Sequence, residues 1–172
     1  MGLKNVYFLL QLSCISLAGF AQPGVEEAHV KAAFIYNFTK YIDWNDYGNK
    51  PTFIIGVIGS SPVMTALKEI AETNQVKDKP IELKVFDDPA NIEFCHILYI
   101  PHQLSYPLSS VLAHARKGML TISDTPGFAA KGTAFNFIKR NGRLKFEANL
   151  KALSEADIKA GSQLLKLAQI VN

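Results

Sequence analysis

Apolar residues in the middle of the chain form short runs that favour buried strands. Residues 52–59 are almost all apolar or β-branched, with no alternation of polar and apolar side chains. Runs of this kind are typical of strands that are buried on both faces, as in parallel sheets. Similar short segments predict further strands at 81–86, 95–100 and 119–123.

Helical spacing of apolar residues marks the segments around these strands. Over residues 24–44, one apolar stripe recurs at steps of three or four positions and consists of Val30, Phe34, Phe38, Tyr41 and Ile42. This spacing predicts one long helix whose aromatic side chains lie in the core. Shorter helices are expected at 62–74, 105–116, 150–158 and 162–171. The first of these follows Ser60-Ser61-Pro62, a hydroxyl cap with proline at the first helical position.

The pattern changes towards the C-terminus. Two short strands, at 133–138 and 143–148, flank an Asn141-Gly142 pair, which is a strong signal for a tight β-hairpin. Together these elements predict an α/β fold: a single three-layer domain with a largely parallel sheet and helices on both faces. The C-terminal antiparallel hairpin is expected at one edge of that sheet.

The first 21 residues have the layout of a secretory signal peptide. Lys4 precedes an apolar stretch at 6–17, which is too short to span a bilayer, and small residues stand before a cut after Ala21. We therefore predict an exported domain at residues 22–172, with no direct insertion into the membrane. Lipidation at Cys14 is the less favoured alternative, because the apolar core continues past that cysteine.

Composition and charge narrow the class of protein. The chain has 172 residues, of which 48% are hydrophobic and 19% charged, as expected for one globular domain. Its formal net charge is +3, without a concentrated basic stripe, so nucleic acid is not an expected partner. Cleavage would leave Cys95 as a lone cysteine in a predicted buried strand, which favours an inert thiol and excludes an intramolecular disulfide.

No motif in the chain predicts catalysis, a metal or a cofactor. The four histidines include no i, i+4 pair on one helix and no cysteine at ligand spacing. The nucleophile elbow of serine hydrolases is also missing. Open α/β sheets bind ligands at the carboxyl ends of their strands, which here are followed by the loops 59–62, 101–107 and 123–127. The loop at 59–62 could bind an anion at a helix start, although an ordinary helix cap explains it at least as well.

Polar residues gather late in the chain and form a candidate ligand or partner surface. They are Asp124, Asn136, Arg143, Glu147 and Asn149. Arg143 and Glu147 lie four positions apart on one predicted strand, so their side chains point to the same face. Two interpretations stay open: a charge-paired structural latch, which base rates favour, or half of a polar recognition surface.

Several segments resemble the YfiR-like family of bacterial periplasmic proteins. Residues 30–44 resemble the opening helix of that family almost position by position. Further similarities follow in the family's order at residues 53–59, 95–100, 120–128, 136–137, 143–150 and 162–165. Two features depart from the family pattern. Lys131-Gly132 stands where the family has paired glycines, and Cys95 has no partner for the disulfides that members often carry.

The resemblance implies a dimeric periplasmic regulator without enzymatic activity or cofactor. Such a protein contacts the periplasmic part of an inner-membrane diguanylate cyclase and holds the cyclase inactive, so that its release raises cyclic-di-GMP and promotes biofilm formation. Its output is a difference in affinity for two states of the partner. The alternative is a periplasmic small-molecule sensor that acts on a different membrane receptor. A hydrolase using Ser60, Ser61 or His102 is the least favoured class.

Overall fold

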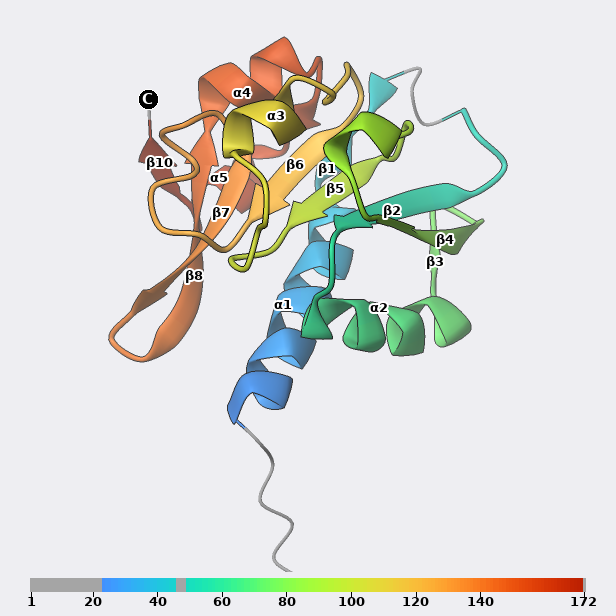
Figure 1. Cartoon of the computed structure of the whole chain (residues 1–172), viewed down its shortest axis with the longest axis horizontal. Helices are drawn as coiled ribbons and strands as arrows, with labels where there is room; N and C mark the ends of the chain where they lie inside the picture. Colours follow the sequence, from blue (N-terminus) through green and yellow to red (C-terminus); the bar gives the residue numbers. More distant parts are fainter. Residues whose placement is uncertain (1–22, 46–48, 172) are drawn as a thin grey trace, which may run out of the picture.

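A mixed sheet of eight strands forms the centre of the structure, a computed structural model that describes residues 23–45 and 49–171 (Figure 1). The strand order is β10-β8-β7-β6-β5-β2-β4-β3. Five neighbouring strands run parallel, namely β7 (Phe135–Arg140), β6 (Leu120–Ser123), β5 (Ile97–Ile100), β2 (Phe53–Ile58) and β4 (Lys79–Phe86). The predicted signal peptide lies outside the described residues.

Within the main sheet, antiparallel pairing is confined to the two ends of this parallel block. On one side β8 (Arg143–Asn149) pairs antiparallel with β7, and the short β3 (Gln75–Val76) does the same with β4 on the other. A separate two-stranded sheet joins β1 (Ile42–Asp43) to β9 (Lys159–Ala160).

Helices cover both faces of the sheet, as the sequence predicts. On one face lie α1 (Pro23–Phe38) and α2 (Pro62–Thr73), and the other carries the 3-10 turn η2 (Pro89–Asn91) and α3 (Leu108–Leu112). Two further short helices, α4 (Leu150–Glu155) and α5 (Ser162–Leu165), follow β8 (Figure 1). The three-layer α/β class is therefore confirmed. Within the described part of the chain, every helix is too short or too polar to cross a membrane.

The core is divided by the sheet into two apolar clusters. The larger cluster packs α1 onto β7 and β8 through Phe34 and Phe38. The Phe34 ring meets Phe137 and Phe146 edge-on, while the Phe38 ring stacks on Phe137 and is tilted against Phe146. The smaller cluster packs α3 and η2 onto the other face. Gly56 in β2 allows the closest approach, because a Cβ atom there would lie 2.5 Å from the ring of Phe86.

The first helix is shorter than the apolar stripe predicts, so the expectation of a helix over 24–44 is wrong at its end. The α-helix stops at Phe38, and three tight turns lead into β1. Val30 and Tyr41, which the stripe places in the core, are exposed. The buried face consists instead of Ala28, Ala32, Ile35 and Phe38. Small residues allow the helix to pack closely, and pairing of Ile42 with Ala160 extends the chain beyond the helix.

The C-terminal segment also differs from expectation. Residues 162–171 do not form one helix: α5 ends at Leu165, and β10 (Gln169–Val171) then pairs parallel with β8. The hairpin of β7 and β8 is present, with Asn141 and Gly142 both at positive φ, as a type I′ turn requires. However, β10 rather than the hairpin forms the edge of the sheet, because it covers the outer side of β8 over Glu147–Asn149.

The chain reverses its direction of winding beside β2. It leaves β2 through α2 to reach β4 on one side, and then crosses to β5 on the other side. Such switch points leave a crevice at the carboxyl ends of the two central strands, where ligands of α/β proteins commonly bind. The loops predicted at 59–62 and 101–107 follow these two strands, and the loop predicted at 123–127 follows the neighbouring β6.

Candidate functional site

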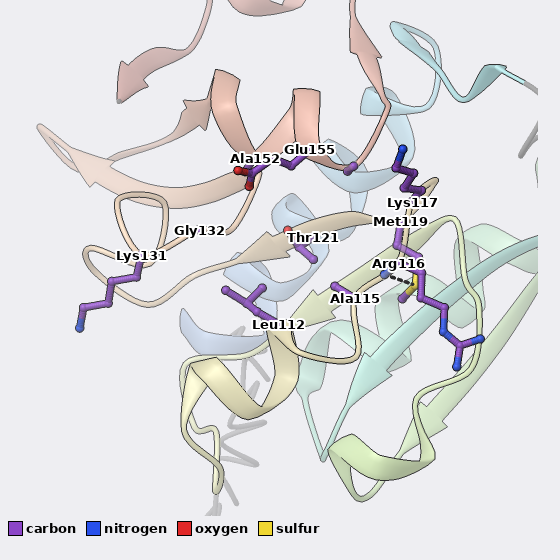
Figure 2. A pocket seen from close by; sticks show the side chains of 11 residues that line it. Leu112, Ala115, Arg116, Lys117, Met119, Thr121, Lys131, Gly132, Ala152 and Glu155 are labelled. Atoms are coloured by element: carbon purple, nitrogen blue, oxygen red, sulfur yellow. Dashed lines mark hydrogen bonds between the residues drawn. The ribbon is translucent and has the colours of Figure 1, made fainter.

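A hollow of about 430 Å³ opens between α3, α4 and the loop that precedes β7 (Figure 2). Its lining is mixed: apolar side chains such as Leu112, Met119 and Ala152 alternate with charged ones, among them Lys131 and Glu155. A volume of this size falls within the range of small-molecule pockets. The hollow lies at the amino end of β6, since Met119 directly precedes that strand, so it is not in the crevice that the sequence suggests.

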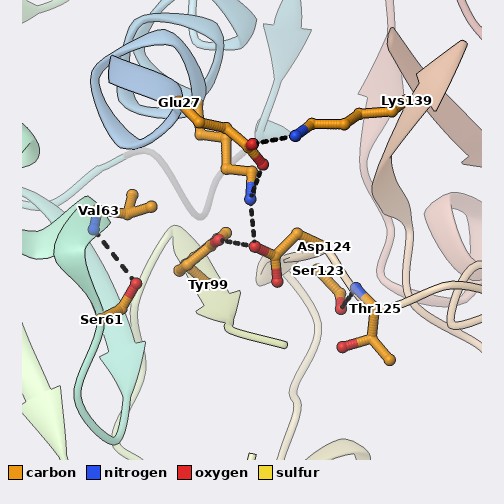
Figure 3. Close-up of polar contacts among 9 residues, drawn as sticks. Glu27, Ser61, Val63, Tyr99, Ser123, Asp124, Thr125 and Lys139 are labelled. Atoms are coloured by element: carbon orange, nitrogen blue, oxygen red, sulfur yellow. Dashed lines mark hydrogen bonds and ion pairs between the residues drawn. The ribbon is translucent and has the colours of Figure 1, made fainter. Parts of the chain in front are cut away.

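A polar network occupies the carboxyl ends of β5 and β6 instead (Figure 3). Asp124 follows β6 directly, and one of its carboxylate oxygens, Oδ2, accepts hydrogen bonds from Lys31 Nζ at 2.5 Å and from the Tyr99 hydroxyl at 2.8 Å. Tyr99 comes from β5 and Lys31 from α1. The network therefore ties the first helix to two central strands.

The network continues to the neighbouring strand through Glu27. This carboxylate pairs with Lys31 at 2.8 Å along the helix and with Lys139 of β7. Hydrogen bonds from Lys139 and Lys31 lower the pKa of Glu27 below its ordinary value. Burial alone would lower the pKa of Lys31, but hydrogen bonds to Asp124 and Glu27 outweigh that effect and raise it. Glu27 and Lys31 are therefore both charged at neutral pH.

The chemistry of this network suits a structural role, in which it holds α1 against the strands, rather than proton transfer. Burial, reinforced by Asp124, raises the pKa of the Tyr99 hydroxyl far above its ordinary value, so the phenol stays protonated. The other oxygen of Asp124, Oδ1, is buried and accepts no hydrogen bond from the described residues. Ser61, at the start of α2, uses its hydroxyl to accept from the backbone N–H of Val63. The ordinary helix-cap interpretation of the loop at 59–62 is thus confirmed.

A second polar row lies on the opposite face of the sheet. Ser123, Asn136 and Glu147 are register partners across β6, β7 and β8. The Asn136 amide donates to Glu147 Oε2 at 3.0 Å, while its own oxygen is buried and without a donor among the described residues. These two predicted residues are therefore in direct contact, but they point away from Asp124.

The remaining two predicted residues have different surroundings. Asn149 is buried; its side chain caps α4 by accepting from Ala152 N and anchors the preceding loop by donating to Ala129 O at 2.8 Å. Arg143 lies at the turn end of the hairpin and is exposed. The structure thus joins Asn136 to Glu147 and separates Asp124, Asn149 and Arg143 from that pair.

The proposed latch between Arg143 and Glu147 is not formed. Glu147 contacts Asn136 instead, and no ion pair joins it to Arg143. The reason is distance, because residues four apart on a strand are separated by roughly 13 Å along it. The recognition-surface interpretation remains a prediction.

The residues that sequence reasoning missed are those that complete the network around Asp124. Lys31 and Glu27 are four apart on α1, a spacing that favours an ion pair, and Lys31 lies among small apolar residues on a buried helix. This combination is the feature of the sequence from which a buried ion pair on α1 could have been predicted. Tyr99 lies in a fully apolar strand, and nothing in the sequence distinguishes its hydroxyl from a packing group.

Neither a metal site nor a reactive thiol is evident in the described part of the chain. No group of three or more His, Cys, Asp and Glu side chains is arranged there to hold a metal ion. Cys95 is completely buried, and burial raises the pKa of its thiol to about 12. The thiol is therefore protonated at neutral pH, as the inert interpretation expects.

Comparison with known proteins places the chain in a family. No curated protein matches the sequence. The family described as YfiR/HmsC-like matches over residues 28–169, from the first turns of α1 to the start of β10, and its members are known for periplasmic regulation of diguanylate cyclases. Because the match covers most of the chain, this protein belongs to the YfiR/HmsC-like family.

Proposed function

We propose that this protein is a periplasmic repressor of an inner-membrane diguanylate cyclase, exported through cleavage after Ala21. The observation that carries the proposal is the family match over residues 28–169. The chemistry of the described residues supports a binding role, since the charged groups at the carboxyl ends of the strands neutralise one another and the tyrosine among them stays protonated.

The proposed mechanism is selective binding. The protein binds the inactive state of the cyclase more tightly than the active state, and only that difference shifts the cyclase towards inactivity. A shift from mostly active to mostly inactive enzyme requires a preference of about 10⁴-fold. From the family resemblance we also propose that the protein acts as a homodimer, so that a second copy of the chain presents the same binding surface again.

Deletion of the gene tests this function. We expect higher cellular cyclic-di-GMP, measured by mass spectrometry, and more biofilm. Expression of the whole chain should restore both to the starting level, whereas a chain without residues 2–21 should fail because it is not exported. An unchanged cyclic-di-GMP level after deletion would contradict the proposal, and full rescue by the leaderless chain would contradict the periplasmic location.

The alternative function is a small-molecule sensor, which the hollow between α3 and α4 favours. Its volume of about 430 Å³ and its mixed apolar and charged lining suit a small amphiphilic metabolite. A saturable rise in melting temperature with one compound of a metabolite library, lost in Ala152→Trp, would support this alternative. Ala152 lines the hollow, so a bulky side chain there fills it. The two functions are compatible if the metabolite controls the affinity for the cyclase.

A further inference from the structure

Three cationic side chains gather at the end of the β7–β8 hairpin. Arg140 and Arg143 are direct register partners in the ladder, and Lys145 follows two positions later on the same side of β8. Together with Asn141 they line a hollow of about 350 Å³, which we call the hairpin hollow. All four residues are exposed, and the hairpin projects from the body of the protein (Figure 1).

The positive charge of the hairpin hollow is not neutralised within the described chain. Like charges directly opposite each other destabilise an antiparallel pair, so Arg140 and Arg143 are unfavourable for folding alone. Among residues 23–45 and 49–171, no carboxylate forms an ion pair with either arginine or with Lys145. Arg140 donates one hydrogen bond to Gln169 on β10, at 3.3 Å, and Glu147 is held by Asn136.

An anionic binding partner would offset this repulsion. Guanidinium groups bind carboxylates through paired hydrogen bonds, and two arginines side by side favour a ligand with at least two carboxylates close together. The exposure of all the lining side chains suits an extended chain rather than a small ligand, which needs enclosure for affinity. Only part of β8, Glu147–Asn149, is paired with β10, so the strand next to the hollow leaves backbone groups for such a chain.

We propose that the hairpin hollow binds an extended acidic peptide segment, and that this segment belongs to the membrane-bound partner. The assignment to the partner rests on the proposed function, whereas the binding of acidic peptide does not. A lipid surface fits less well. Segments that bind anionic lipids carry roughly four to eight basic residues, and the fourth basic side chain of this hairpin, Lys139, is paired with Glu27 on the opposite face.

A charge-matched pair of variants tests the site. The probe is a fluorescein-labelled peptide of alternating glutamate and serine, and binding is followed by fluorescence anisotropy at low and high salt. We expect R140E/R143E to weaken binding by at least about tenfold, with the salt dependence largely lost. The control K68E/K77E changes the net charge equally at exposed residues far from the hairpin, and should bind like the unaltered chain.

Each other outcome overturns the proposal. Equal weakening in both variants would show that net charge alone attracts the peptide, and no binding to the unaltered chain would show that the site has no affinity for carboxylates. Binding to vesicles containing phosphatidylglycerol but not to the peptide would assign the hollow to lipid. Should R140E/R143E fail to fold by circular dichroism, R140Q/R143Q removes the same charges without adding new ones.

The cellular readout separates this inference from the proposed function. If deletion of the gene leaves cyclic-di-GMP unchanged while R140E/R143E still loses peptide binding, the proposed function fails and the peptide site stands. If deletion raises cyclic-di-GMP and R140E/R143E restores repression fully, the regulator stands and the hollow is not its contact with the partner.

Discussion

Asp124 illustrates how a single residue connects distant parts of this protein. Its carboxylate accepts hydrogen bonds from a helix 93 positions earlier and from the neighbouring strand, through Lys31 and Tyr99. The side chain of Lys31 is only 13% exposed, so its ammonium has lost most of its contact with water. The carboxylates of Asp124 and Glu27 compensate for that loss. Removal of the single charge of Asp124 should therefore affect both the helix and the strand that contact it.

Replacement of Asp124 by asparagine should destabilise the fold. The amide can still accept from Tyr99, but Lys31 keeps only Glu27 as its counter-charge, and we expect a loss of about 2 kcal/mol in the free energy of unfolding. Urea denaturation measures this loss. Asp87→Asn, at an exposed position, serves as the control and should change stability by less than about 0.5 kcal/mol. Equal midpoints for the two variants would contradict the structural role of the network.

At the scale of elements, short segments are positioned by caps and pairing rather than by their own propensity. Helix α4 has six residues and would be marginal in isolation. Asn149 stabilises it by capping its first turn, and the same side chain anchors the loop before β7 through Ala129. One residue thus determines where a helix begins and where a crossover loop lies.

Two substitutions separate these roles of Asn149. Asn149→Ala removes both the cap and the loop anchor, and should cost about 2 kcal/mol. Asn149→Ser keeps a capping oxygen but loses the donor to Ala129, so about half of that cost is expected. Thermal unfolding of both variants, with hydrogen exchange of the loop amides, measures the difference. If serine and alanine are equally destabilising, the cap contributes nothing and the loop anchor alone matters.

Elements of different length were predictable to different degrees. The strands at 52–59, 95–100 and 119–123 follow from their apolar runs, and the hairpin follows from Asn141-Gly142, because in each case the signal is local. The end of α1 and the strand β10 do not follow, since two or three residues carry too little pattern of their own. Their conformation is set by partners far along the chain, Lys159–Ala160 and Glu147–Asn149.

At the scale of the whole molecule, ion pairs connect the layers. Glu27 on α1 pairs with Lys139 on β7, and through Lys31 it is connected to the ends of β5 and β6. These contacts join the helical layer to the sheet at the sheet's carboxyl edge (Figure 3). The stability of the assembled domain should therefore depend on the ionisation of this carboxylate.

The pH dependence has a definite sign. The pKa of Glu27 is lowered in the folded protein, so the unfolded chain binds a proton more readily, and the stabilisation is present above the ordinary pKa near 4.5. It is lost as the pH falls through the lower, folded value. The melting temperature should drop from pH 5.5 to 3.5, and it should drop less in Glu27→Gln. Glu72→Gln, at an exposed position on α2, should behave like the unaltered chain, and identical pH profiles for all three would contradict the prediction.

As for the fold, one part of the candidate site could be predicted from the sequence and another part could not. The candidate polar residues could be selected because Asp124 follows a strand and Asn136, Arg143, Glu147 and Asn149 lie on or beside a hairpin. How these residues group in space could not be predicted, because it depends on the register of the strands and on the face of the sheet to which each side chain points. Asp124 points to α1, Asn136 and Glu147 share the other face, and Arg143 is paired in register with Arg140.

The sequence by itself determined the class of fold, the parallel strands, the hairpin turn and the family, because apolar runs, turn residues and ordered motifs are local properties of the chain. Only the tertiary structure decided that β10 closes the edge of the sheet, that Lys31 and Tyr99 meet at Asp124, and that two arginines face each other on the hairpin. These features arise from strand register and from contacts between residues far apart in the chain. No local pattern specifies such contacts, since their free energy appears only when the layers are assembled.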